Sequence, residues 1–155
     1  MKRILHLMLF FCSFSTFLIG LAPATGQEQG CTVKIVSPSN DDRVGEVDDV
    51  KGTGAIPAGT YLWVFAHRRG LALWWPEGGG AAVITKGAWL VTATFGQERD
   101  NGRQFEIAAV VVDRATNAKL ENWVTKAGET GQYPGMNLPA PVEGCNLQQV
   151  TVTKR

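Results

Sequence analysis

Hydrophobic and polar residues alternate with a period of two along most of the chain after residue 30, which is the period of β-strands. The clearest case is 61–67, where Tyr61, Trp63, Phe65 and His67 fall on one face and Leu62, Val64 and Ala66 on the other. Because both faces are largely apolar, this strand is expected to be covered on both sides. Six more strands are predicted at 31–36, 47–54, 71–75, 89–95, 105–112 and 147–153, separated by clusters of Gly, Pro, Asn and Asp. Seven short strands at this spacing predict an all-β, antiparallel sandwich.

One segment follows a helical period instead. Its apolar residues fall at i, i+3 and i+4: Leu120, Trp123 and Val124. With Gly128 as the stop, this spacing predicts one short helix over about 116–127. The next segment, 131–144, is rich in Pro and Gly and predicts a long loop before the last strand. A loop of this length either forms a binding feature or covers a sheet edge.

The N-terminal segment has the pattern of a secretory signal peptide. Lys2 and Arg3 precede an apolar stretch over 4–21, and small residues follow at Ala22, Ala24 and Gly26. This pattern predicts a cleaved leader over 1–26 and a single domain over 27–155, with cleavage after Ala24 or Gly26. A retained membrane span is the alternative, but polar residues interrupt the stretch and no charged flank follows it. We therefore expect a secreted or periplasmic protein.

Only two cysteines remain once Cys12 is removed with the leader, namely Cys31 and Cys145. An even pair in an exported chain is expected to be oxidised. The sequence therefore predicts a Cys31–Cys145 disulfide that joins the two ends of the domain. The alternative roles, a thiol nucleophile or a metal ligand, lack a CxxC spacing.

Composition argues against several function classes. The chain has 15 Lys and Arg against 14 Asp and Glu, and loss of Lys2 and Arg3 brings its net charge to about −1. That balance provides no basis for binding nucleic acid or anionic lipid. We expect no enzyme, because the chain after the predicted leader has one histidine, His67, and two serines, Ser37 and Ser39, which nominate no nucleophile and base pair. A glycosidase would need only two carboxylates, and these are the available ones: Asp100, Asp113 and Glu106.

No cofactor and no metal are expected. Zinc lacks ligands, since both cysteines are assigned to the disulfide and a single histidine remains. Calcium could use Asp48 with Asp49, or the acidic loop at 98–101, but neither cluster has EF-hand spacing. The simpler interpretation is that these acids form turns.

The five tryptophans are the remaining candidates for a binding site. Trp74 and Trp75 are adjacent, so on a strand their rings point to opposite faces. A solvent-facing ring beside Pro76 would stack on a sugar or anchor a protein partner, together with Tyr133. In the other interpretation, the helix or the Pro-rich loop covers that ring.

Several segments carry a resemblance to a known class of domain. They are 32–38 (TVKIVSP), 50–52 (VKG), 62–64 (LWV), 74–76 (WWP), 87–89 (GAW), 95–96 (FG) and 105–112 followed by Asp113. These segments resemble bacterial immunoglobulin-like or fibronectin type III-like domains of exported proteins. The helix and the end-joining disulfide depart from that pattern.

The resemblance implies an immunoglobulin-like sandwich that acts as a non-catalytic protein-interaction or structural module of the cell envelope. The alternative is a carbohydrate-binding module that uses Trp74 or Trp75 with Tyr133. The partner would be an envelope protein or a surface glycan. A sugar platform should show coplanar exposed aromatic rings on one face, whereas a protein site should show a mixed apolar patch or an open strand edge.

Overall fold

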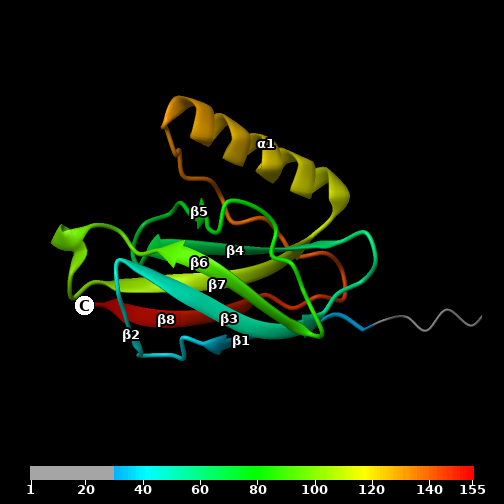
Figure 1. Cartoon of the computed structure of the whole chain (residues 1–155), viewed down its shortest axis with the longest axis horizontal. Helices are drawn as coiled ribbons and strands as arrows, with labels where there is room; N and C mark the ends of the chain where they lie inside the picture. Colours follow the sequence, from blue (N-terminus) through cyan, green and yellow to red (C-terminus); the bar gives the residue numbers. More distant parts are fainter. Residues whose placement is uncertain (1–29) are drawn as a thin grey trace, which may run out of the picture.

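The computed structural model describes residues 30–155, which form two β-sheets and one long helix (Figure 1). The predicted leader over 1–26 and its cleavage site lie outside the described residues. The helix lies over one face of the larger sheet, and the smaller sheet lies on the opposite face (Figure 1). The described chain is thus mostly β, in three layers.

The smaller sheet has three antiparallel strands, in the order β1-β3-β6. They are β1 (Thr32–Ser37), β3 (Val47–Ala55) and β6 (Ala88–Thr94). The larger sheet has five strands, in the order β2-β8-β7-β4-β5. They are β2 (Arg43–Val44), β8 (Gln148–Lys154), β7 (Gln104–Val112), β4 (Tyr61–Arg68) and β5 (Trp75–Pro76). Because β2 pairs with β8 in parallel while its other pairs are antiparallel, the larger sheet is mixed.

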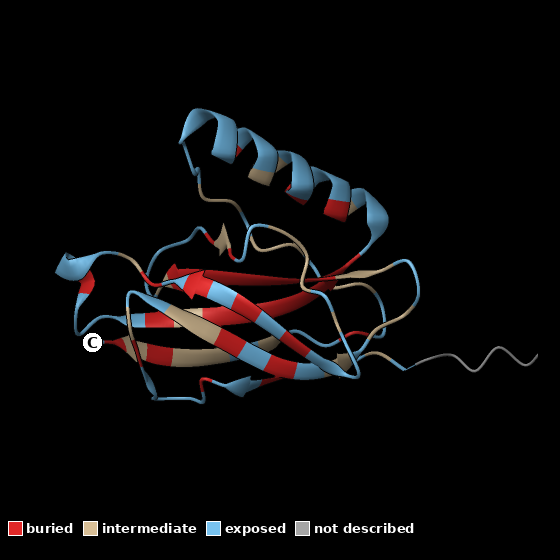
Figure 2. Ribbon diagram, in the orientation of Figure 1, coloured by how far each residue is buried: buried red, intermediate tan, exposed pale blue. Residues whose placement is uncertain are grey.

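An apolar core fills the space between the two sheets, and we call it the inner core. It includes the side chains that the alternation assigned to one face of β4: Leu62, Val64 and Ala66. Other members come from both sheets, among them Val50, Trp89, Val91, Phe105, Ile107 and Val152. Burial alternates along β6, whereas nearly every residue of β4 is buried (Figure 2).

The structure corrects one strand prediction and adds one strand that was not predicted. The strand expected at 71–75 is wrong: β5 spans only Trp75–Pro76, and Leu71 and Leu73 are 40% and 41% exposed. Pro76 belongs to β5, which is tolerated because β5 lies at the sheet edge. Strand β2 was missed, since a strand of two residues is too short to show alternation.

The helix α1 (Arg114–Thr130) is longer than predicted at both ends. It begins after Asp113, whose side chain accepts a hydrogen bond from the Thr116 N–H at 2.7 Å. It continues through Gly128 and ends at Gly131, where φ is 67°. Gly128 is therefore a helical residue and not the stop, which lies three positions later.

A second apolar cluster, which we call the outer core, lies between α1 and the five-stranded sheet. It contains the opposite face of β4, Trp63 and Phe65, together with Trp74, Leu120 and residues of β7. The Trp63 indole N–H donates to Oδ1 of Asn117 on α1 at 2.8 Å, and both residues are buried. The prediction that β4 is covered on both faces is confirmed.

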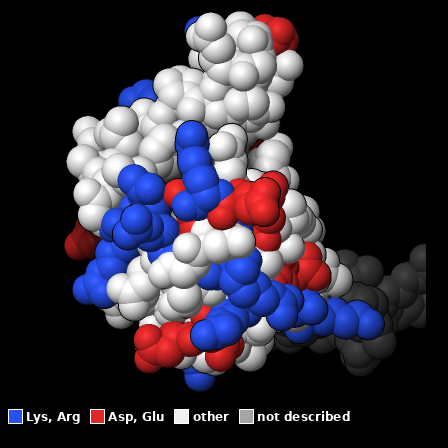
Figure 3. Space-filling model, turned by 90° about the vertical axis from the view of Figure 1, so that its left-hand side faces the viewer, with Lys and Arg blue, Asp and Glu red and all other residues white. Residues whose placement is uncertain are grey.

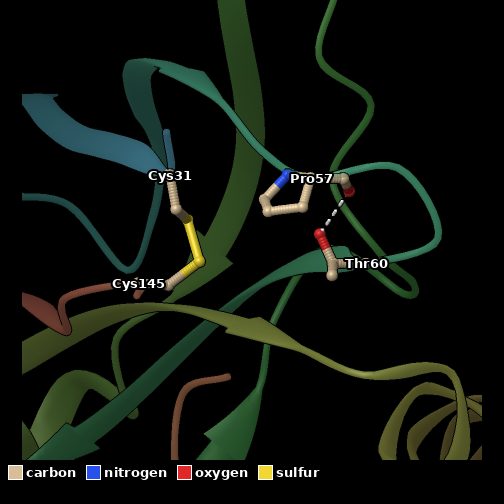
Figure 4. Close-up of a disulfide and its surroundings, with 4 residues drawn as sticks. All are labelled: Cys31, Pro57, Thr60 and Cys145. Atoms are coloured by element: carbon tan, nitrogen blue, oxygen red, sulfur yellow. Dashed lines mark hydrogen bonds between the residues drawn. A yellow bond between two sulfur atoms is a disulfide. The ribbon is translucent and has the colours of Figure 1, made fainter. Parts of the chain in front are cut away.

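The predicted disulfide is present and connects Cys31, just before β1, with Cys145, three residues before β8 (Figure 4). Cys145 is buried in the inner core, and Cys31 packs against that core. Close by in the same view, the Thr60 hydroxyl donates to the Pro57 carbonyl at 2.7 Å and closes the turn before β4.

Candidate functional site

A cleft of about 920 Å³ runs along the edge of the five-stranded sheet at β5. One wall comes from β6 and the segment after it, including Thr92, Thr94 and Gln97. The opposite wall comes from the C-terminal half of α1 and from Tyr133 in the loop that follows. Its lining is mixed, because apolar and aromatic side chains stand beside charged ones.

Three aromatic residues from distant parts of the sequence meet in this cleft: Trp75, Trp123 and Tyr133. The Trp75 indole N–H donates to the Tyr133 carbonyl at 2.8 Å, and the Trp123 indole N–H donates to the Pro134 carbonyl at 3.0 Å. Both indoles are thereby fixed to the loop. The Tyr133 ring is 60% exposed, lies 6.1 Å from the Trp123 ring and makes an angle of 66° with it.

The loop at 131–144 covers the sheet edge next to β5. The Trp74 N–H donates to the Met136 carbonyl at 2.8 Å, and the Met136 N–H donates back to the Trp74 carbonyl at 2.9 Å. A Cβ on Gly135 would lie 2.9 Å from Cζ2 of Trp75, so the loop packs directly on that indole. Of the two interpretations of this loop, the cover is confirmed, and the same loop also supplies Tyr133 to the cleft.

The two adjacent tryptophans have different surroundings. Trp74 is only 8% exposed and stacks on His67, with ring centroids 3.8 Å apart and planes inclined by 15°. Trp75 is partly buried and lines the cleft. Of the three candidate binding residues, the structure therefore brings Trp75 and Tyr133 together at the cleft and places Trp74 in the outer core.

Glu77 is the residue of this cleft that sequence reasoning missed. Its side chain is buried, and Oε2 accepts a hydrogen bond from the Thr94 N–H at 2.8 Å. Burial raises the pKa of Glu77 to about 7, although the hydrogen bond from Thr94 acts in the opposite direction. A signal was present in the sequence, since Glu77 is a lone acid between Trp75-Pro76 and three consecutive glycines.

Charged residues gather at the end of the cleft near the short 3₁₀-helix η1 (Glu98–Asp100). Asp100 accepts hydrogen bonds from the Gln97 N–H at 3.0 Å and from the Arg68 guanidinium at 3.1 Å, which hold its pKa below the usual value. Both carboxylate oxygens of Asp100 are thus engaged, Oδ2 within the turn and Oδ1 by Arg68 of β4. Figure 3 shows Lys and Arg side chains spread over this end of the molecule, interleaved with acidic ones.

The other two carboxylates considered for a glycosidase lie elsewhere. Asp113 caps α1, and Glu106 on β7 contacts Nε2 of His67 at 2.7 Å. The imidazole Nδ1 of His67 is buried and has no hydrogen-bond partner in the described chain. Within residues 30–155, no three His, Cys, Asp or Glu side chains lie close enough together to hold a metal ion. No helix of the described chain is both long and apolar enough to cross a membrane.

Comparison with known proteins adds no relative. No family model matches the chain, and no curated protein matches it by sequence.

Proposed function

We propose that this protein is a non-catalytic, exported binding module of the immunoglobulin-like class, and that its cleft holds a segment of a protein partner. The strand order supports the class. In an immunoglobulin domain, the first, second, fourth and fifth strands share one sheet, and the third strand shares the other sheet with the last two. Here β1, β3 and β6 share one sheet, while β4 lies beside β7 and β7 beside β8.

Export is supported by the disulfide between Cys31 and Cys145. Disulfides of this kind persist in oxidising compartments and are rare in the cytosol. Together with the leader-like segment over 1–26, the disulfide favours a periplasmic or secreted protein.

The observation that carries the protein-binding proposal is the geometry of the aromatic residues. A flat sugar platform needs coplanar exposed rings, but the Trp123 and Tyr133 planes are inclined by 66° and Trp74 is buried. The cleft is instead concave and mixed, with aromatic walls and charged groups at one end. Such a lining fits a polypeptide segment better than a sugar face.

Gly128 provides a sharp test, because it lines the cleft from α1. A Cβ added there meets no heavy atom within 4 Å, so we expect a large side chain at this position to narrow the cleft and to leave the fold intact. Leu90 on β6 is 52% exposed and does not line the cleft, which makes Leu90→Ala a matched surface control.

The experiment selects binders to the purified, oxidised protein from a random dodecapeptide library displayed on phage. We expect the selected peptides to bind wild type and Leu90→Ala equally and to bind Gly128→Phe at least ten-fold more weakly. Equal binding to Gly128→Phe, or no selected peptide, would contradict the proposal. Co-sedimentation with peptidoglycan or other polysaccharides that is lost in Gly128→Phe would favour the carbohydrate-binding alternative.

A further inference from the structure

We infer that the cleft selects a partner segment that carries a lysine or arginine side chain, and that the Glu77 carboxylate receives its cationic group. This inference rests on the proposed protein-binding function and names the chemistry of the partner.

The first support is the state of the Glu77 carboxyl group. It is 9% exposed, and the Thr94 N–H fixes Oε2, while no hydrogen bond from the described chain engages Oε1. No basic side chain of the described chain forms an ion pair with Glu77 within 4 Å, whereas Asp100 in the same cleft is paired with Arg68. A shielded carboxylate with one unused oxygen is a strong acceptor for a charged donor.

The second support is that Glu77 is held rigidly. Its own N–H donates to the Val64 carbonyl at 2.9 Å, which anchors it to β4. The next residue, Gly78, has φ of 74°, and a Cβ there would lie 2.5 Å from Cγ1 of Val91. The chain is therefore pressed onto β6 directly after Glu77. A carboxyl group fixed from both sheets loses little freedom when it binds a ligand.

The third support is the aromatic lining of the cleft that contains Glu77. Trp75, Trp123 and Tyr133 provide apolar walls along which the methylene stem of Lys or Arg can lie. Aromatic faces also attract cations directly. A cleft of about 920 Å³ is much larger than an ammonium ion, which favours a longer segment over a small cation.

The remaining charges of the cleft leave Glu77 available. The titratable or charged groups lining it are His67 and Arg68 of β4, Arg99 and Asp100 of η1, and Tyr133 of the loop. The lining residues of β6 and α1 carry no charge: Thr92, Thr94, Trp123, Val124 and Gly128. Asp100 offsets the charge of Arg68, and His67 contacts Glu106. Among the described lining residues, Arg99 is then the cationic side chain without an acidic partner, and it forms no ion pair with Glu77.

The test measures affinity by NMR titration of the oxidised protein with four probes: N-acetyl-lysine methylamide, the arginine and norleucine analogues, and choline. We expect the lysine and arginine probes to bind at least ten-fold more tightly than norleucine, which has the same stem without the charge. In Glu77→Gln, this preference should disappear. Glu98→Gln removes an exposed acid of η1 that does not line the cleft and should retain the preference.

The pH dependence provides a second readout. Because a proton on Glu77 competes with the cation, affinity for the lysine probe should fall at least ten-fold between pH 8 and pH 5. In Glu77→Gln, the affinity should not fall in this way.

The outcomes separate the inference from the proposed function. Selected dodecapeptides that bind in the cleft without a basic residue, and with unchanged affinity for Glu77→Gln, would overturn the inference but leave the proposed function standing. Lysine-probe binding without any selected peptide would support the role of Glu77 and overturn the protein-binding function. Choline binding as tight as that of the lysine probe would overturn the inference in favour of a small ammonium ligand.

Discussion

The two faces of the five-stranded sheet are both covered, but they are covered in different ways. The inner face packs on the three-stranded sheet through an apolar core that the disulfide reaches. The outer face packs on α1 and the loop at 131–144. Single hydrogen bonds from indole N–H groups connect these parts, such as that from Trp63 to Asn117. Only three of the 17 residues of α1 are buried, and Figure 2 shows most of its surface exposed. We infer that the inner layer holds the fold, while the outer layer shapes the cleft.

The largest expected effect comes from the inner layer. Replacing both cysteines (Cys31→Ala with Cys145→Ala) opens a loop with a sequence separation of 114, which should cost roughly 4 to 5 kcal/mol of unfolding free energy. Urea unfolding of the double variant and of the wild type, with and without reductant, measures this loss. A loss below about 1 kcal/mol would show that the unfolded chain is not restrained in this way.

A substitution in the outer core should lower the free energy of unfolding by less, and its effect should be confined to the outer layer. Leu120 is 4% exposed in the outer core, so Leu120→Ala should cost about 3 kcal/mol. Because α1 buries few residues, we expect amide hydrogen exchange to rise first in α1 and to change little in β4 and β7. Equal acceleration in the strands would mean that the two layers unfold as one unit.

Glu77, which lies in the cleft, should make the free energy of unfolding depend on pH. The pKa of Glu77 is raised from 4.5 to about 7, so folding favours the protonated form, and stability is lost as the pH rises through this window. Between pH 5 and pH 8, wild type should lose about 2 to 3 kcal/mol relative to Glu77→Gln. Thermal unfolding of both proteins across this range measures the difference, and parallel curves would contradict it.

The smallest expected effect is a gain in stability from a substitution in the outer layer. Gly128 lies within α1 and has open space around its Cα, so Gly128→Ala should stabilise the protein by about 0.5 to 1 kcal/mol. Urea unfolding gives the value. A loss instead of a gain would mean that α1 depends on glycine at this position for a reason other than space.

The sequence predicted the parts of the molecule whose signal is local. The double-sided apolar pattern of 61–67 places β4 between two layers, and both are present. The helix was also predicted from its apolar spacing, over about 116–127, although both ends were displaced because the caps are Asp113 and Gly131. The cysteine pair predicted the disulfide correctly.

The cleft could not be predicted in the same way, since it is made by contacts between distant segments. Trp75 and Tyr133 are brought together by a hydrogen bond from the Trp75 indole N–H to the Tyr133 carbonyl, which no spacing in the sequence reveals. Glu77 is buried, and its carboxylate accepts a hydrogen bond from the Thr94 N–H of β6, which lies 17 positions later in the sequence. The strand expected at 71–75 was misplaced for a similar reason, because Met136 pairs with Trp74 from outside the sheet.

The disulfide also decides how the molecule would carry a pulling force. The bond between Cys31 and Cys145 bypasses every element from β1 to α1, so tension between residue 31 and residue 155 passes through the sulfur atoms into β8. Only the ten residues after Cys145 can lengthen, by at most about 35 Å of extended chain. The residues that line the cleft all lie outside that path.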